Sequence, residues 1–184
     1  MMCAVLEDPT NAATTAVRTV SPAVFRDTMR ALPGGVCVIA TGEEGQRAGF
    51  TATAVCSVTA DPPRLLVCVN RGVTAYGQLT ANRKMSINVL SRGQQEIADL
   101  FAGGVPGVKG ESRFQATAWT QMQDVPVLEE ACASFVCSVA EMVEQSTHTV
   151  FICDVLDARR VGEDECDAVD PLVYANGRFI GLQG

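Results

Sequence analysis

Residues 49–71 read GFTATAVCSVTADPPRLLVCVNR, and this stretch decides the fold. Two apolar runs in it, Ala52–Val58 and Leu65–Val69, are rich in residues that favour strands. Asp61-Pro62-Pro63 separates the runs with a turn that no helix crosses. The first run carries small side chains, whereas a strand that only fills a core carries larger ones. We therefore expect a flat, polar-edged ligand against this strand. The small residues are Thr51, Ala52, Thr53, Ala54 and Ser57.

The rest of the chain shows mostly strand patterns. A helix is predicted from Ser21-Pro22 to Leu32, because Ser caps a helix and Pro suits its first position. Short helices are predicted at Ala75–Ala81 and Gln94–Phe101, with Ile97, Leu100 and Phe101 facing the core. Strands are expected at Val36–Thr41, Arg47–Val58, Met85–Leu90, Ala131–Glu144 and His148–Val161, with a closing hairpin of Leu172–Tyr174 and Arg178–Leu182. Gly103–Glu111 is expected to be a flexible loop, Trp119–Leu128 irregular and Asp164–Asp170 an acidic loop.

Six to eight strands joined largely by hairpins, with at most three short helices, predict an antiparallel barrel rather than a βαβ sheet. With 184 residues, 47% of them hydrophobic, the chain fits one domain with a sizeable core. Residues 1–19 show no periodicity and are expected to be a flexible tail, with the domain spanning residues 20–184.

The sequence favours a cytoplasmic protein that spans no membrane. Its longest uncharged apolar stretch is far shorter than the ~20 residues that a transmembrane helix needs. Glu7 and Asp8 stand where a signal peptide would carry its apolar block.

Eight cysteines raise the question of a disulfide scaffold or a metal site. No CxxC occurs, the chain has a single histidine, and five cysteines lie in apolar strand-like runs where Cys acts as a small hydrophobe. We therefore predict structural thiols and no metal. The five are Cys37, Cys56, Cys68, Cys137 and Cys153.

The net charge of −7 argues against a nucleic-acid surface. Residues 47–113 are the exception, with eight basic and four acidic side chains. This local excess suits an anionic ligand that carries phosphate, although a solvated surface explains it equally well.

Motifs for side-chain catalysis are absent: the chain holds no Walker loop, GxGxxG, HExxH or GxSxG. His148 is the single imidazole, and composition alone favours a hydrogen-bonded core or dimer-contact histidine slightly over a chemical role. An organic cofactor would carry the reaction itself and leave the protein to orient it. A flavin fits the hydroxyl-rich strand, with Arg71 available for its phosphate.

An ordered set of motifs resembles the flavin-reductase-like split-barrel proteins, the small reductase components of two-component flavin-dependent monooxygenases. The resemblance spans about residues 22–181 in collinear order. It rests on Phe25-Arg26-Asp27-x-Met29, Pro33–Thr41, Gly49–Val58, Asp61–Leu66, Ile87–Leu90, Gln94-Gln95, Phe101-Ala102, Arg113-Phe114, Ser146–Thr149 and Pro171–Tyr174.

The resemblance implies a homodimeric, six-stranded, antiparallel Greek-key split barrel, mainly β, with a few short flanking helices. It implies reduction of FAD or FMN by NADH or NADPH, and delivery of the reduced flavin to a separate oxygenase. Thr51, Ala52, Thr53 and Ala54 would line the flavin ring edge. Ser57 would reach the ribityl or phosphate portion. The residues that would hold phosphate are Asn70, Arg71 and Thr74. His148 would act where nicotinamide meets flavin. Tyr174 and Arg178 would complete the site.

Two departures leave the choice between FAD and FMN and the form of the nicotinamide pocket open, and the sequence does not distinguish NADH from NADPH. Gly72 and Val73 stand where the family usually offers further phosphate contacts, and Ala175-Asn176 follows Tyr174 where a His or Arg is common. The mechanism we expect is hydride transfer from the nicotinamide to the flavin, in which positioning supplies most of the acceleration. The alternatives are an FMN oxidase or a reductase of another acceptor, a non-catalytic flavin-binding or redox-sensing protein, and a purely structural barrel.

Overall fold

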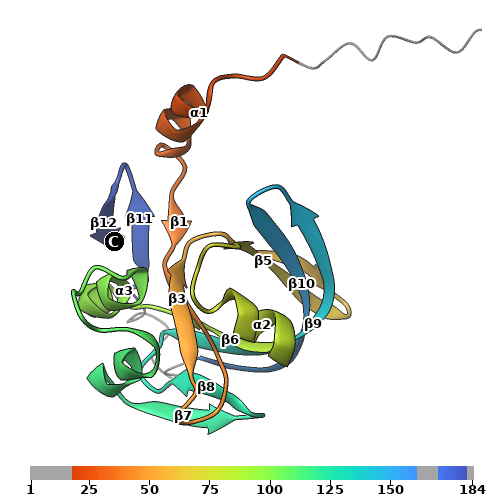
Figure 1. Ribbon diagram of the computed structural model, residues 1–184, viewed down its shortest axis with the longest axis vertical. Coiled ribbons are helices and arrows are strands. Elements are labelled where there is room, and N and C mark those ends of the chain that lie inside the picture. The colour runs from red at the N-terminus through yellow and green to blue at the C-terminus, as the bar shows by residue number, and fades with distance from the viewer. Residues whose placement is uncertain (1–17, 161–169, 182–184) are drawn as a thin grey trace, which may run out of the picture.

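The computed structural model describes residues 18–160 and 170–181, and about half of them belong to β-strands (Figure 1). The main element is a rolled antiparallel sheet of seven strands in the order β3-β2-β6-β9-β10-β5-β4. The predicted antiparallel split-barrel class is therefore confirmed, whereas the predicted count of six strands is one too few for this sheet. Its strands are β2 (Cys37–Thr41), β3 (Ala48–Ala52), β4 (Val55–Ala60), β5 (Pro63–Asn70), β6 (Lys84–Val89), β9 (Ala133–Gln145) and β10 (His148–Arg160).

The sheet is split between β3 and β4, its two edge strands, which are consecutive in the chain. The prediction of one strand over Arg47–Val58 is wrong on this point. Ala52 is the last residue paired with β2, and Ala54 already accepts a hydrogen bond from Cys68 N (3.0 Å), on the opposite side of the opening. Thr53 and Ala54 thus carry the chain from one edge of the sheet to the other.

Two smaller sheets flank the barrel. One contains β1 (Gly34–Gly35), β11 (Leu172–Ala175) and β12 (Arg178–Gly181), and it confirms the closing hairpin. The other is the hairpin of β7 (Trp119–Met122) and β8 (Val125–Leu128), in the segment predicted to be irregular. Its turn uses Gln123 and Asp124 with positive φ, and neither is the glycine that normally signals such a turn.

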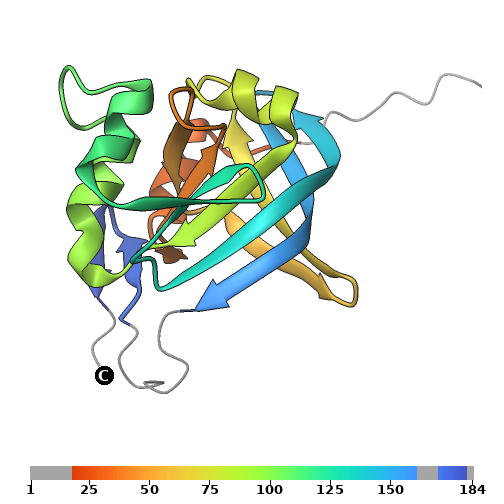
Figure 2. The ribbon, with the colours of Figure 1, turned by 90° about the horizontal axis from the view of Figure 1, so that it is seen from below.

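Three short α-helices occur where helices are predicted, although their ends differ by a few residues. They are α1 (Pro22–Met29), α2 (Tyr76–Asn82) and α3 (Gln95–Ala102). Ser21 caps α1 by accepting a hydrogen bond from Val24 N (3.3 Å). Arg92–Gln94 and Gly110–Ala116 form 3-10 helices, and the second one shortens the predicted flexible loop. Figure 2 shows α3 and the β11–β12 hairpin on the same side of the barrel.

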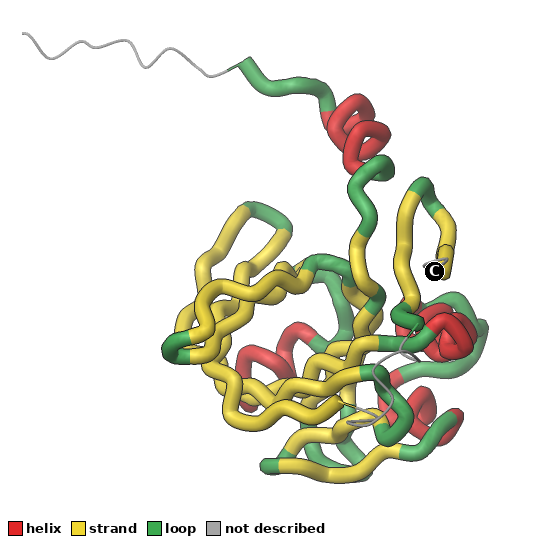
Figure 3. The backbone as a smooth tube through the Cα atoms, turned by 180° about the vertical axis from the view of Figure 1, so that it is seen from behind, coloured by secondary structure: helices red, strands yellow, loops and turns green. Residues whose placement is uncertain are grey.

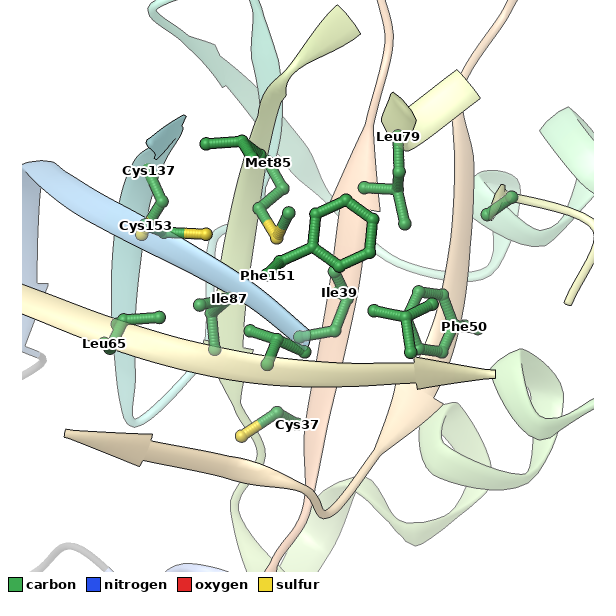
Figure 4. Packing of buried hydrophobic residues seen from close by; sticks show 14 of the residues in the cluster. Cys37, Ile39, Phe50, Leu65, Leu79, Met85, Ile87, Cys137, Phe151 and Cys153 are labelled. Carbon is green, nitrogen blue, oxygen red and sulfur yellow. The ribbon is translucent and has the colours of Figure 1, made fainter. Parts of the chain in front are cut away.

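The main core fills the barrel interior, with large side chains from every wall (Figure 4). Ile39, Met85, Ile87 and Phe151 are each 0% exposed. The cysteines predicted to be structural divide into two groups. Cys37, Cys137 and Cys153 are buried, and burial raises the pKa of each of these thiols to about 12. Cys68 is half-buried, and Cys56 is exposed on β4, so the prediction of a core position is wrong for Cys56.

A second core lies between α3 and the barrel wall. Phe101 of α3 meets the ring of Phe114 edge-on (centroids 5.1 Å apart), and Trp119 packs against both. Gly49 of β3 permits this contact, because a Cβ there would lie 2.8 Å from Ile39 O and 3.0 Å from the Phe101 ring. α3 is therefore held firmly against β3.

No helix among the described residues is long and apolar enough to span a membrane. Residues 1–17 of the predicted tail and residues 164–169 of the predicted acidic loop lie outside the described residues.

Candidate active site

The hydroxyl-rich run lies at the split of the barrel. Thr53 and Ala54, which cross the split, are exposed, while Thr51 and Ala52 at the end of β3 are half-buried. Gly34 of β1 approaches this crossing closely, since a Cβ on Gly34 would lie 3.0 Å from Thr53 Cβ and 3.2 Å from Thr53 O. The crossing residues therefore have one open side and one side supported by backbone.

A hollow of about 580 Å³ opens beside this run. Its floor is the end of β3, one wall is α3 and the other is the β11–β12 hairpin. The hollow brings together five predicted site residues that are far apart in the sequence. The five are Thr51, Ala52, Thr53, Tyr174 and Arg178, and the other lining residues are Gln95, Asp99, Ala102, Gly177 and Phe179.

Thr51 has a second role that the sequence does not reveal. Its hydroxyl donates to the carbonyl of Ala98 in α3 at 2.6 Å. This bond joins the floor of the hollow to one of its walls, and it commits the hydroxyl hydrogen to the protein. Thr53, whose side chain is exposed, is the freer hydroxyl of the pair.

The hairpin wall follows from local sequence. Asn176 (φ 55°) and Gly177 (φ 77°) form the tight turn that this dipeptide favours. The turn places Tyr174 and Arg178 near the tip of the hairpin. The ring of Tyr174 lies edge-on to Phe179 (centroids 5.3 Å apart), which supports the tyrosine although the residue is 39% exposed.

His148 belongs to a second group at the far end of β5 and β10. It is exposed and lies directly opposite Asn70 in the antiparallel ladder. The hydroxyl of Thr147 is 2.9 Å from Nδ1 of His148, so the turn itself supplies a partner for the ring. The Nε2 atom is left to face solvent or a ligand.

The predicted phosphate ligands lie near this histidine, and two of them already have protein partners. Asn70 accepts a hydrogen bond from Gly72 N at 2.8 Å through its side-chain oxygen. Arg71 Nη1 is 3.5 Å from both a carboxylate oxygen of Glu144 and the carbonyl of Ser146. Arg71 is therefore partly neutralised, and its charge is less available to a phosphate than the sequence suggests. Thr74 is exposed in the loop before α2.

Ser57 lies far from the predicted phosphate-binding residues around Asn70. Ser57 is exposed on β4 opposite Leu65, and β5 runs five residues further before it reaches Asn70. At about 3.3 Å per residue this is a separation of roughly 16 Å. Ser57 and Asn70 thus lie in opposite directions along β5 from Ala54.

Several lining residues are absent from the predicted site, and four of them carry long or charged polar side chains from the two neighbouring helices. Gln95 and Asp99 come from α3, whose residues the sequence indicates only as core. Arg26 and Arg30 come from α1 and line an adjoining hollow. Their spacing of four residues on one helix face was a visible signal, but nothing in the sequence placed α1 beside Thr53.

A flavin is compatible with this arrangement. The hollow lies within the range of about 300–1,000 Å³ that small-molecule sites occupy. Hydroxyls and backbone lie along one side and Tyr174 along the other, which matches a flat ring with polar edges. Among the described residues, no cluster of three or more His, Cys, Asp or Glu side chains could hold a metal ion.

Comparisons with known proteins identify the family. Residues 29–183 match the family model described as flavin reductase like domain. The chain is 42% identical over 156 residues to "FMN reductase (NADH) RutF" of Bradyrhizobium diazoefficiens, covering 84% of this chain and 82% of the relative.

Two solved structures extend the comparison. One is the NADH:FAD oxidoreductase SgcE6 of Streptomyces globisporus in complex with NAD and FAD fragments (TM-score 0.78, 26% identity, covering 91% of this chain and 98% of the other). The second is BorF, the flavin reductase component of a bacterial two-component tryptophan halogenase (TM-score 0.76, 27% identity, covering 89% and 99%). The predicted family and enzyme class are confirmed: this chain belongs to the flavin reductase like family.

Proposed function

We propose that this protein transfers a hydride from NADH to FMN or FAD and releases the reduced flavin. The observation that carries the proposal is the hollow at the split of the barrel, where Thr51–Thr53 meet the β11–β12 hairpin. When bound there, the flavin supplies the redox chemistry, which explains why the chain needs no catalytic motif of its own.

The role of the protein residues is then to bind and to orient. Thr53 and the backbone at the crossing contact the ring edge, and α3, held by the bond from Thr51 to Ala98, bounds the ring from one side. His148 directs Nε2 toward the nicotinamide carboxamide, because Thr147 engages Nδ1. The tautomer with the proton on Nε2 makes this atom a donor to a carbonyl oxygen.

The proposal has three finer parts. They are the choice between FMN and FAD, the use of NADH rather than NADPH, and a separate oxygenase that consumes the reduced flavin. The name of the Bradyrhizobium relative favours FMN and NADH, whereas SgcE6 is named for FAD. BorF is named as the reductase component of a two-component system, and this supports a separate oxygenase partner. The cytoplasmic location stays a prediction of the sequence.

We also propose that the protein is a homodimer, and α1 supports this. Every residue of α1 is exposed, and Figures 1 and 3 show the helix standing clear of the barrel. An eight-residue helix with no buried face is marginal in water. A second copy would cover its apolar side chains. These are Val24 (55% exposed), Phe25 (56%) and Met29 (44%), and Val20 (62%) lies just before the helix.

The test is a steady-state assay under air that follows the loss of NADH absorbance. We expect oxidation of NADH with added FMN or FAD and no further acceptor, followed by reoxidation of the flavin by oxygen. Turnover only after another acceptor is added would favour a reductase of that acceptor. Flavin that copurifies without any NADH oxidation would favour a binding protein, and absence of both binding and turnover would leave a structural barrel. Sedimentation of the same sample tests the dimer.

A further inference from the structure

A second hollow, of about 390 Å³, adjoins the first. Thr53, Tyr174 and Gly177 line both, so the two hollows meet at the crossing and at the tip of the hairpin. The second hollow lies between α1 with its following turn and the β11–β12 hairpin. Its other lining residues are Arg26, Met29, Arg30, Leu32, Pro33, Gly34, Ala54, Ala175 and Asn176.

Two arginines, Arg26 in α1 and Arg30 at its C-cap, line this second hollow. Arg26 and Arg30 are one helical turn apart and share one face. Neither forms an ion pair with any residue in the described part of the chain. Arg178, which lines the first hollow, likewise forms no ion pair with any described residue. Three guanidinium groups that form no ion pair within the described residues therefore line the two hollows, alongside one carboxylate, that of Asp99 in the first hollow. The net charge of the chain, by contrast, is −7.

A backbone hydrogen bond, and not an arginine side chain, joins α1 to the β11–β12 hairpin. Arg30 O accepts a hydrogen bond from Asn176 N at 2.8 Å, which joins the end of the helix to the hairpin turn. Met29, Leu32 and Tyr174 add apolar surface beside the two guanidinium groups. Val24 and Phe25 lie on other faces of α1, so a partner that covers them leaves the arginine face open.

This set of groups matches one chemical class of ligand. Guanidinium groups pair with phosphate oxygens in two-point contacts, and they also stack on flat rings, as a tyrosine does. We propose that the second hollow binds the adenosine diphosphate half of a dinucleotide, with Arg26 and Arg30 on its phosphates. The inference rests on the proposed reductase function, which puts the redox-active half in the first hollow. FAD and NADH both carry an adenosine diphosphate half, and the experiment separates them.

The first measurement needs no activity. ADP is titrated calorimetrically into the wild-type protein, into Arg26→Gln, into Arg30→Gln and into Lys109→Gln. Lys109 is exposed and lines neither hollow, so its variant is a control for the loss of one positive charge. We expect ADP to bind the wild type and the control alike, and each arginine variant to bind about five- to ten-fold more weakly, as expected for a charged hydrogen bond in a partly solvated site. No binding to the wild type, or equal weakening in all three variants, would overturn the proposal.

The second measurement identifies the dinucleotide. Reduced nicotinamide mononucleotide lacks the adenosine diphosphate half of NADH, as FMN lacks that of FAD. If NADH uses the second hollow, the arginine variants raise the KM for NADH and not that for the mononucleotide. If FAD uses it, they raise the KM for FAD and not that for FMN. An equal rise for the full and the truncated ligand in both pairs would overturn the assignment to the adenosine half.

The two proposals can fail separately. If the wild type does not oxidise NADH with either flavin, the proposed function fails, while the ADP titration still decides whether this hollow binds a nucleotide diphosphate. Arg26 and Arg30 are exposed, so their variants are expected to melt within about 2 °C of the wild type. If one variant both binds ADP more weakly and melts at a lower temperature, Arg26→Lys and Arg30→Lys decide the cause. These variants keep the positive charge and must restore part of the ADP binding.

Discussion

His148 and Asn70 lie directly opposite each other at the ends of β10 and β5. The pair is joined to the split of the barrel through β5, because Cys68, two residues before Asn70, donates its backbone N–H to Ala54 O. One strand therefore connects the crossing residues, where we propose the flavin ring, with the histidine that we propose orients the nicotinamide.

Replacement of His148 by alanine is the most direct test of this arrangement. We expect His148→Ala to lower kcat/KM for NADH by about five- to ten-fold, which corresponds to the loss of one ordinary hydrogen bond. The side chain is exposed, so the melting temperature should stay within about 2 °C of the wild type. His148→Gln, which retains a donor, should recover part of the rate. Unchanged kinetics in His148→Ala would remove the histidine from the mechanism.

Gly34 offers a test of the crossing itself. A methyl group on Gly34 would be pressed against Thr53 Cβ and Thr53 O, so Gly34→Ala must displace the crossing by a few tenths of an ångström. We expect weaker flavin binding, by roughly three- to ten-fold in Kd, and a small loss of stability of about 1 kcal/mol. Flavin fluorescence or absorbance titration measures the first effect and thermal melting the second.

The neighbouring glycine is a matched control. A Cβ on Gly35 would meet no atom within 4 Å, so Gly35→Ala makes the same chemical change without the contact. Gly35→Ala should bind flavin as the wild type does. If the two variants bind equally well, the crossing is not part of the flavin site.

These tests concern features that the sequence discloses to different degrees. Asp61-Pro62-Pro63 and Asn176-Gly177 mark their turns through local backbone chemistry, and both hairpins are found where predicted. The break at Thr53 and Ala54 is invisible locally, because residues with the same strand preference lie on both sides of it. It arises because β3 pairs with β2 while β4 pairs with β5, and pairing partners are a property of the whole sheet.

The site likewise combines features that the local sequence shows with features that only the tertiary structure shows. The small hydroxyl residues at the end of β3 are visible as a local oddity, whereas their meeting with Tyr174 and Arg178 depends on a contact across more than a hundred residues. The same is true of Arg71, whose approach to Glu144 reduces the charge that the sequence alone would assign to a phosphate. The local basic excess is compatible with a phosphate-bearing ligand and equally with a solvated surface, and only the tertiary arrangement shows which charges remain without an ion pair.

The contact between Glu111 and Arg47 is expected to make the stability of the fold depend on pH. Burial acts to raise the pKa of this carboxyl group, but hydrogen bonds and charge from Arg47, with a backbone hydrogen bond from Gly45, outweigh it and lower the pKa below its ordinary value of 4.5. Arg47 donates to the carboxylate from its backbone N (2.6 Å) and from Nε (2.7 Å). A lowered folded-state pKa gives stability that is present above the ordinary pKa and is lost as the pH falls through the folded-state pKa.

We therefore expect Glu111→Gln to lower the free energy of unfolding at pH 7 by about 1–2 kcal/mol. The difference from the wild type should shrink as the pH is lowered below 4.5. Urea unfolding at a series of pH values measures both effects. Glu141→Gln, which changes an exposed carboxylate on β9, is the control and should leave the profile unchanged within about 0.5 kcal/mol. A constant difference between Glu111→Gln and the wild type at all pH values would contradict the assigned cause.

The cysteines predict a graded pattern of chemical labelling. The thiolate is the reactive form, and burial raises the pKa of Cys37, Cys137 and Cys153 to about 12, so at pH 8 these thiols are almost entirely protonated as well as inaccessible. Cys56 is exposed on β4 and should be alkylated by iodoacetamide within minutes. Peptide mass spectrometry resolves the sites individually, and unfolding in urea should make the buried three react as fast as Cys56. Labelling of Cys137 or Cys153 in the native protein at the rate of Cys56 would show that the barrel interior opens to solvent far more readily than its packing implies.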